Sequence, residues 1–108
     1  MVTLRMHLDV DESNRDRFID AVRGLMGPIR VESGNLTCLL CEDVIDSSAL
    51  YLIQEWQDES GFRRHIHGPA FRTLLVSIDM LGRSPEISVT RQQKRDKLGS
   101  IGDLYEEA

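Results

Sequence analysis

Two hydrophobic periodicities follow one another along this chain, and their order restricts its fold more than any other feature of the sequence. Residues 2–10 place apolar side chains at every second position, which is typical of a strand with one buried face. Residues 13–32 place them at helical spacing, so we expect an amphipathic helix there. Gly27 and Pro28 should kink this helix or break its last turns, and Gly34 should end it in the left-handed conformation.

The same two periodicities predict the remaining elements. Strands are expected over 35–43, 49–57 and 85–91, with the first two forming a hairpin, and helical segments are expected over 59–67 and 70–81. The order is therefore β-α-β-β-α-β, which is the ferredoxin-like arrangement of the α+β class.

This arrangement leaves one face of the predicted sheet without cover, because both helices pack on the other face. Strand alternation places a partly apolar set of side chains on the uncovered face: Thr3, Arg5, His7, Tyr51, Ile53 and Glu55. A face of this kind is unfavourable in water, and a two-fold dimer that stacks two sheets would bury it. We therefore expect a homodimer.

The length of 108 residues fits one domain, which we place at residues 1–91. Residues 92–108 form a polar C-terminal tail, for which two interpretations stay open. The tail is either a solvated and partly flexible segment, or an arm that lies over a partner subunit. Ile101, Leu104 and Tyr105 would anchor such an arm.

Composition excludes several classes of function. A net charge of −5 argues against nucleic acid and anionic membranes as partners, since both favour a basic surface. We find no signal peptide and no apolar run long enough to span a bilayer, so we expect a cytoplasmic protein.

Cys38 and Cys41 lie three apart on a predicted strand, which directs their sulfurs to opposite faces. We therefore expect neither a redox pair nor a metal site, and no nucleotide-binding motif occurs.

The stretch from Tyr51 to Phe71 holds the best candidates for chemistry. Trp56 ends a strand and shares its parity with Leu52, so it is either a core residue or the wall of a pocket. His65 lies nine residues later on the next helix and borders the buried side of that helix. It is either a structural histidine, or an acid/base or heme ligand in a cleft. His65 and His67 do not converge on one metal, because positions i and i+2 of a helix point apart.

Three segments together resemble the antibiotic biosynthesis monooxygenase domain, over about residues 2 to 90. They are Arg-Val-Glu-Ser-Gly-Asn-Leu at 30–36, Leu-Tyr-Leu-Ile-Gln-Glu-Trp-Gln-Asp-Glu-Ser-Gly-Phe-Arg-Arg-His at 50–65, and Gly-Pro-Ala-Phe at 68–71. The resemblance implies a dimeric α+β barrel, in agreement with the predicted order of elements. Some members of this family oxidise hydroquinones or aromatic polyketides with dioxygen and without a cofactor, and others degrade heme.

The resemblance implies a cofactor-independent monooxygenase in which His65 is the base and Trp56 a wall for a flat aromatic substrate. Met6, Leu52, Phe62 and Phe71 would form the rest of the pocket, and no metal is expected. Heme binding and degradation is the alternative, although Met6 stands where that branch has an asparagine. The polyketide-oxidising branch has an asparagine at the position of Leu52. A third possibility is a non-catalytic dimeric protein that binds a small molecule or acts in stress, with His65 as a structural residue.

Overall fold

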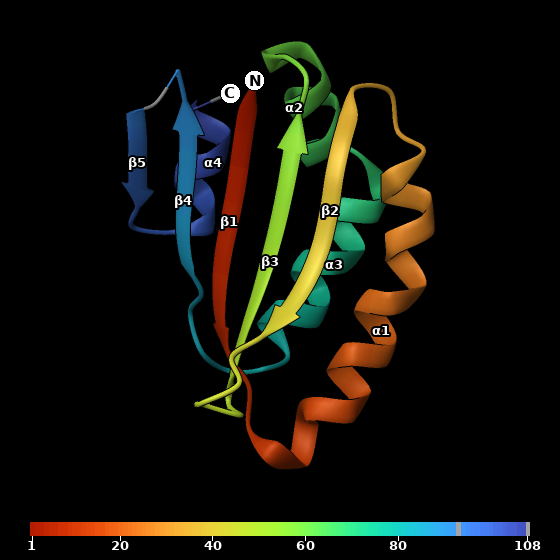
Figure 1. Cartoon of the computed structure of the whole chain (residues 1–108), viewed down its shortest axis with the longest axis vertical. Helices are drawn as coiled ribbons and strands as arrows, with labels where there is room; N and C mark the ends of the chain where they lie inside the picture. The colour runs from red at the N-terminus through yellow and green to blue at the C-terminus, as the bar shows by residue number, and fades with distance from the viewer. Residues whose placement is uncertain (93, 108) are drawn as a thin grey trace.

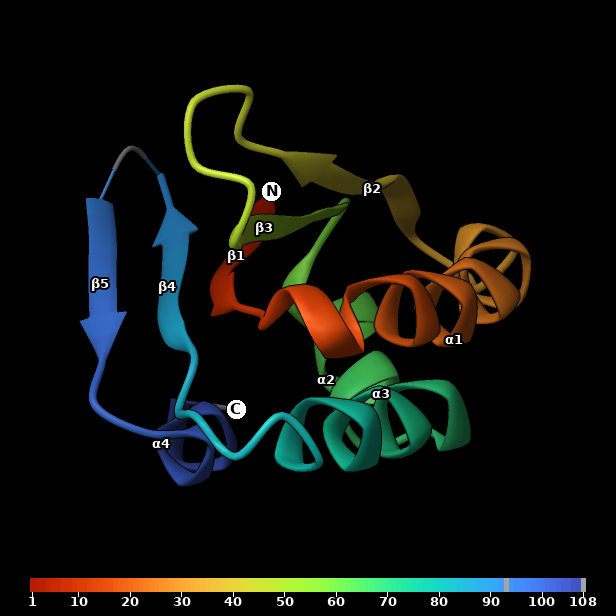
Figure 2. The same cartoon turned by 90° about the horizontal axis from the view of Figure 1, so that it is seen from below.

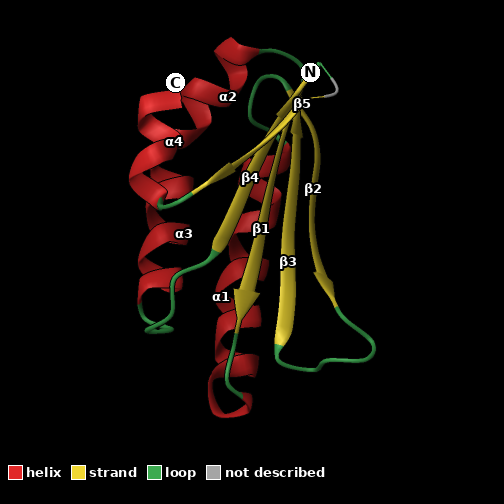
Figure 3. Ribbon diagram, turned by 90° about the vertical axis from the view of Figure 1, so that its left-hand side faces the viewer, coloured by secondary structure: helices red, strands yellow, loops and turns green. Residues whose placement is uncertain are grey.

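A computed structural model describes residues 1–92 and 94–107 of the chain as one antiparallel sheet with helices on one face. The sheet has five strands in the order β2-β3-β1-β4-β5 (Figures 1 and 3). The strands are β1 (Val2–Asp9), β2 (Asn35–Glu42), β3 (Ala49–Trp56), β4 (Glu86–Arg91) and β5 (Lys94–Leu98). The helices are α1 (Glu12–Arg30), α2 (Glu59–Ile66), α3 (Pro69–Asp79) and α4 (Ile101–Glu107). All the predicted strands and helical segments are confirmed in kind and in order, from β1 to β4, and they form the ferredoxin-like α+β fold.

The alternation of β1 places Val2, Leu4, Met6 and Leu8 in the core beneath the helices. Helix α1 continues through Gly27 and Pro28 to Arg30, so the break considered for its last turns does not occur. Proline removes only one backbone donor, and the turn that follows is closed by the bond from the Val31 N–H to the Gly27 carbonyl at 3.3 Å. Gly34 has a φ of 88°, the left-handed conformation that the sequence predicts. It does not end the helix, however, because α1 ends four residues earlier at Arg30, and Gly34 instead lies directly before β2.

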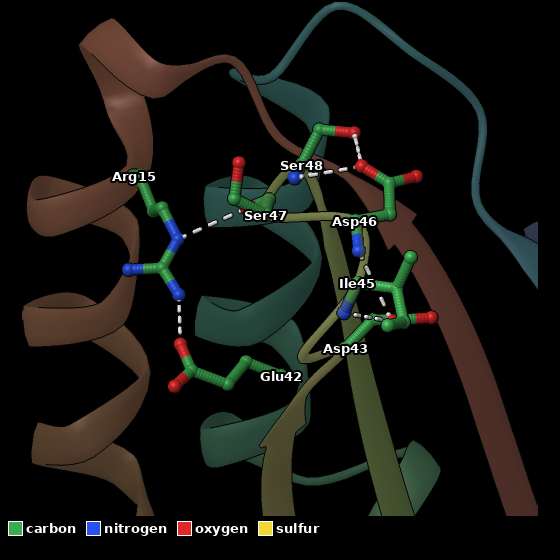
Figure 4. A network of polar contacts seen from close by, with 7 residues as sticks. All are labelled: Arg15, Glu42, Asp43, Ile45, Asp46, Ser47 and Ser48. Atoms are coloured by element: carbon green, nitrogen blue, oxygen red, sulfur yellow. Dashed lines mark hydrogen bonds and ion pairs between the residues drawn. The ribbon is translucent and has the colours of Figure 1, made fainter.

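The β2–β3 hairpin is closed by a polar loop that is fastened to α1 (Figure 4). The Asp46 carboxylate accepts hydrogen bonds from the Ser48 hydroxyl at 2.6 Å and from the Ser48 N–H at 3.0 Å, which lowers the pKa of Asp46. Arg15 of α1 donates to the Ser47 carbonyl at 3.1 Å and pairs with Glu42 at the end of β2. These bonds hold the hairpin end of the sheet against the first helix.

The second helical region is divided where the sequence predicts. Helix α2 begins after Asp58, whose carboxylate accepts from the Gly61 N–H at 2.9 Å, and ends at Ile66. Helix α3 starts with Pro69, a position where its missing N–H leaves no helical bond unmade. Figure 2 shows that α1, α2 and α3 lie together on one side of the sheet.

The C-terminal segment differs from the expected solvated tail. Residues 94–98 form β5, which pairs with β4, and the chain then turns into α4. Leu104 of α4 is fully buried in the same hydrophobic core as Trp56, and Ile101 packs against that core. The polar composition conceals this role because an edge strand and a surface helix bury only a few apolar residues each. The anchors considered for an arm over a partner, Ile101 and Leu104, therefore pack within their own chain.

The face of the sheet opposite the helices carries the side chains that alternation assigns to it. The Tyr51 ring stacks on His7 at 4.8 Å between ring centroids, and the Arg5 guanidinium lies over the same ring at 4.9 Å. Tyr51 and Ile53 are only half-buried in the single chain. Among the residues that the structure describes, no helix is long and apolar enough to cross a membrane.

Candidate functional site

The six predicted site residues lie in one buried cluster between the sheet and the helices. Each of the six side chains is at most 1% exposed: Met6, Leu52, Trp56, Phe62, His65 and Phe71. The His65 ring stacks on the Trp56 indole at 4.5 Å between centroids and meets the edge of the Phe71 ring at 5.0 Å. Met6 of β1 and Leu52 of β3 are paired positions of neighbouring strands. Trp56, His65 and Phe71 therefore meet from one strand and two helices. Met6 and Leu52 belong to the same hydrophobic core but lie four residues along their strands from the Val2–Trp56 pair.

Local sequence explains how His65 comes to face inward. Phe62, His65 and Ile66 lie at positions i, i+3 and i+4 of α2, which puts them on one side of the helix, and all three are buried. The end of this helix is held in place by α4, because the Tyr105 hydroxyl donates to the Ile66 carbonyl at 3.0 Å. His67 points the other way and is exposed, so the two histidines do not converge, as the sequence predicts.

Glu32 is a site residue to which the sequence interpretation assigned no role. Its carboxylate oxygens lie 3.1 and 3.2 Å from His65 Nδ1, and its side chain is 29% exposed. Because a carboxylate only accepts, Nδ1 carries the proton and Nε2 carries the lone pair of the neutral ring. The signal was present in the segment 30–36, where Glu32 follows the first helix, but the contact with His65 spans 33 positions of sequence.

Burial governs the charge of His65. Loss of hydration lowers the pKa of the imidazole below its ordinary value, and the hydrogen bond and charge of Glu32 oppose that effect only in part. The ring is therefore neutral at neutral pH. Its Nε2 atom is buried and has no hydrogen-bond partner among the described residues. The arrangement presents a proton acceptor inside an apolar enclosure, with a carboxylate behind it to stabilise the imidazolium.

Gln54 is a second site residue that the sequence interpretation missed. It lies on the same face of β3 as Leu52 and Trp56, is fully buried, and accepts a hydrogen bond from Trp56 Nε1 at 3.2 Å. Its amide nitrogen is the other buried side-chain atom without a partner in the described part of the chain. An unsatisfied buried polar group costs about 1–3 kcal/mol, so two of them beside one indole indicate a place for a ligand or water.

The site is closed to solvent except through Glu32. A surface recess of about 640 Å³ lies between α3, the loop before β4 and Ile101, and none of the six predicted site residues lines it. Because those six side chains are at most 1% exposed, a ligand reaches them only when a covering element moves aside.

The cysteines take no part in the site as reactive groups. Both are free thiols; Cys38 is buried and Cys41 half-buried, and burial raises the pKa of Cys38. Cys38 Sγ lies 3.8 Å from the sulfur of Met26. Among the side chains that the structure describes, no group of three or more His, Cys, Asp or Glu residues is arranged to hold a metal ion.

Solved structures share this fold at low sequence identity. A proposed antibiotic biosynthesis monooxygenase from Deinococcus radiodurans is 15% identical with a TM-score of 0.79, over 91% of this chain and 98% of that chain. A conserved protein from Methanosarcina mazei is 19% identical with a TM-score of 0.78, over 83% and 90% of the two chains. A protein from Pseudomonas aeruginosa is 24% identical with a TM-score of 0.74, over 84% and 92%. At these identities the likeness concerns the fold.

The sequence itself gives the family. None of the curated proteins matches this chain. The family described as antibiotic biosynthesis monooxygenase has a sequence model that matches residues 1–75. That range runs from β1 into α3 and includes Glu32, Gln54, Trp56 and His65. This chain therefore belongs to the antibiotic biosynthesis monooxygenase family.

Proposed function

We propose that this protein is a cofactor-independent monooxygenase that oxidises a hydroquinone or an aromatic polyketide-like small molecule with dioxygen. One observation carries the proposal: a buried neutral imidazole is bonded to a carboxylate through Nδ1, is stacked on an indole, and has a free Nε2. Such a pair can take a proton from an acidic hydroxyl or C–H group in the absence of water.

The first step is removal of a proton by His65. Nε2 accepts the proton of the substrate, and Glu32 stabilises the imidazolium that results, through the contact at 3.1 Å. The electron-rich anion left behind can pass an electron to dioxygen. In the complete reaction the substrate supplies four electrons to dioxygen; one oxygen atom enters the product and the other leaves as water. Because Glu32 is 29% exposed, it also offers the proton a route to solvent.

The remaining residues bind the ring and exclude water. Trp56 gives a flat wall on which an aromatic substrate can stack. Met6, Leu52, Phe62 and Phe71 provide an apolar lining that strengthens the interaction between the anion and the imidazolium. The half-buried sheet face around Tyr51 and Ile53 supports a homodimer, which would cover that face without involving the buried site.

Heme binding is the second candidate, because one observation favours it. Histidine ligands of metals usually donate the other ring N–H to a carboxylate, and His65 donates Nδ1–H to Glu32 in this way. His65 Nε2 would hold the iron, which would supply the dioxygen chemistry, and Trp56 would lie beside it. Titration with hemin tests this candidate: a Soret band that is lost in His65→Ala supports it.

Dioxygen consumption tests the main proposal. Purified, metal-free protein is given hydroquinones and anthrones, with no cofactor added, and the rate is compared with autoxidation in buffer. We expect turnover that is lost in His65→Ala and kept in His67→Ala, a matched control because His67 is exposed on the neighbouring turn. Full activity in His65→Ala would rule out the base. Absence of turnover and of hemin binding would leave a non-catalytic protein with a structural His65.

A further inference from the structure

We propose that Gln54 is a substrate-binding residue of this site and that its amide N–H selects aromatic rings with a second oxygen. The ring would give its hydroxyl proton to His65 and accept a hydrogen bond from Gln54 through the other oxygen. The inference rests on the proposed function in one respect only: the ligand is the substrate of the same site.

The position of Gln54 is unusual for a glutamine. It lies between Leu52 and Trp56 on the helix-facing side of β3, where every other side chain of that strand face is apolar, and it is fully buried. Glutamine is mostly exposed in folded proteins, since burial of its amide is unfavourable without partners. A leucine in this place would leave the buried indole N–H of Trp56 without its acceptor, so the bond to Trp56 explains the amide oxygen. It does not explain the amide nitrogen, which has no hydrogen-bond partner among the described residues.

The orientation of the amide follows from its neighbour. The indole N–H of Trp56 can only donate, so the amide oxygen of Gln54 must face it, at the observed 3.2 Å. The NH2 group is then turned into the interior, where it has no hydrogen-bond partner in the described structure. Cys38 of β2 is the position paired with Gln54, and its thiol is the adjacent polar group. Burial raises the pKa of that thiol, and the charge of Arg30 and the amide of Gln54 oppose the effect only in part. Because sulfur is a weak acceptor, Cys38 does not satisfy the two N–H bonds of the amide.

The free donor lies beside the same indole as the free acceptor. Gln54 is bonded to the N–H edge of Trp56, and the His65 ring is stacked against Trp56 at 4.5 Å. A ligand that satisfies both atoms needs one O–H group for His65 Nε2 and one acceptor oxygen for Gln54 Nε2. Rings with a hydroxyl and a second oxygen, such as hydroquinones and hydroxylated anthrones, meet that need, whereas simple phenols do not.

Two phenols that differ by one atom test the inference. In para-methoxyphenol an ether oxygen stands where para-ethylphenol has a CH2 group, and the shape and acidity are nearly the same. Each is titrated without dioxygen, and quenching of the fluorescence of Trp56, the single tryptophan of the chain, reports binding. We expect the wild-type protein to bind para-methoxyphenol about three- to tenfold more tightly, the range for one added hydrogen bond.

Variants assign the preference to Gln54. Gln54→Met keeps the length of the side chain and removes the amide, so it should bind the two phenols equally while still binding para-ethylphenol. Ser88→Ala is the matched control, because Ser88 is a buried polar residue on the other face of the sheet, and it should keep the preference. If Gln54→Met does not fold, the side-chain amide resonance of Gln54 in the wild-type protein should shift with para-methoxyphenol and stay in place with para-ethylphenol.

The outcomes separate this inference from the proposed function. Equal affinities in the wild-type protein, a preference that survives in Gln54→Met, or no quenching by either phenol would overturn the role of Gln54. Because dioxygen is absent, the titration does not depend on His65 as a base. A protein that shows the preference but oxidises no hydroquinone would refute the monooxygenase and keep this inference. A protein that oxidises hydroquinones without preferring para-methoxyphenol would refute the role of Gln54 and keep the monooxygenase.

Discussion

Replacement of Glu32 by glutamine removes a negative charge from the site and preserves its shape. The glutamine carbonyl can still accept a hydrogen bond from His65 Nδ1, so the ring keeps its tautomer and its stacking on Trp56. What disappears is the carboxylate charge at 3.1–3.2 Å from that nitrogen. Burial alone then acts on the imidazole, and the pKa of His65 should fall further below its ordinary value.

The size of the effect follows from the kind of hydrogen bond that is lost. A bond to a charged group contributes about 1.5–3 kcal/mol and a neutral bond about 0.5–1.5 kcal/mol, so the imidazolium loses about 1–1.5 kcal/mol. The lower end applies here, because Glu32 is 29% exposed and water screens its charge. If the imidazolium forms in the transition state, kcat/KM should fall about fivefold.

Two measurements on the same variant check this reasoning. NMR titration of the three histidines of the chain gives the pKa of His65, which is assigned with His65→Gln. Dioxygen consumption with a hydroquinone substrate gives kcat/KM. Glu42→Gln is the control, since Glu42 pairs with Arg15 at the hairpin end of the sheet, and it should change neither quantity.

The two measurements can fail separately. A pKa of His65 that stays the same or rises in Glu32→Gln would refute the structural argument about the pair. A pKa that falls while kcat/KM keeps its wild-type value would leave the pair in place and refute the role of His65 as the base.

Three further predictions concern stability, measured as the free energy of unfolding in urea. Leu104→Ala should lower the free energy of unfolding by about 2–5 kcal/mol, because Leu104 is fully buried. Leu36→Ala is the control, since that side chain is 55% exposed, and it should lower the free energy of unfolding by less than about 1 kcal/mol. Equal small losses in the two variants would mean that α4 does not belong to the core. Gly34→Ala should lower the free energy of unfolding by about 1–2 kcal/mol, because φ is 88° at that position. Gly24→Ala should raise it by about 0.5–1 kcal/mol, because Gly24 lies within α1 with open space around it. A neutral Gly34→Ala would contradict the left-handed turn. Burial lowers the pKa of His65, so below pH 6.5 the unfolded chain binds a proton that the folded chain does not. The free energy of unfolding should therefore be unaffected by His65 above pH 6.5 and should decrease as the pH falls below that value. The decline should be shallower in His65→Gln, and an identical decline in both proteins would show that His65 is not buried in its neutral form.

The elements of the fold could be predicted because each depends on neighbours in sequence. The alternation of β1 and the helical spacing of α1 show directly which side of each element is apolar, and Asp58 marks where α2 begins. The order of the elements along the chain and the β2–β3 hairpin were predicted from the same patterns, whereas the order of the strands in the sheet came from the structure. The fifth strand could not be found in this way, because an edge strand with mostly charged side chains lacks the alternation that identifies a strand.

The candidate site was predicted only in its apolar part. Trp56 and His65 lie on adjacent elements, so parity and helical spacing were enough to direct both toward the core. Glu32 and Gln54 carry the polar chemistry of the site, yet a lone glutamate after a helix and a lone glutamine in a strand give no signal of their partners.

Sequence alone therefore determined the order of the elements, the face that each one buries and the family of the chain. Only the tertiary structure decided that Glu32 bonds His65, that Gln54 bonds the Trp56 indole, and that Leu104 of the C-terminal segment completes the core. The physical reason is the separation along the sequence over which each kind of contact acts. Periodicity records the contact of a residue with solvent or core, which is local along an element, whereas a hydrogen bond between residues 33 positions apart depends on where separate elements come to rest against one another.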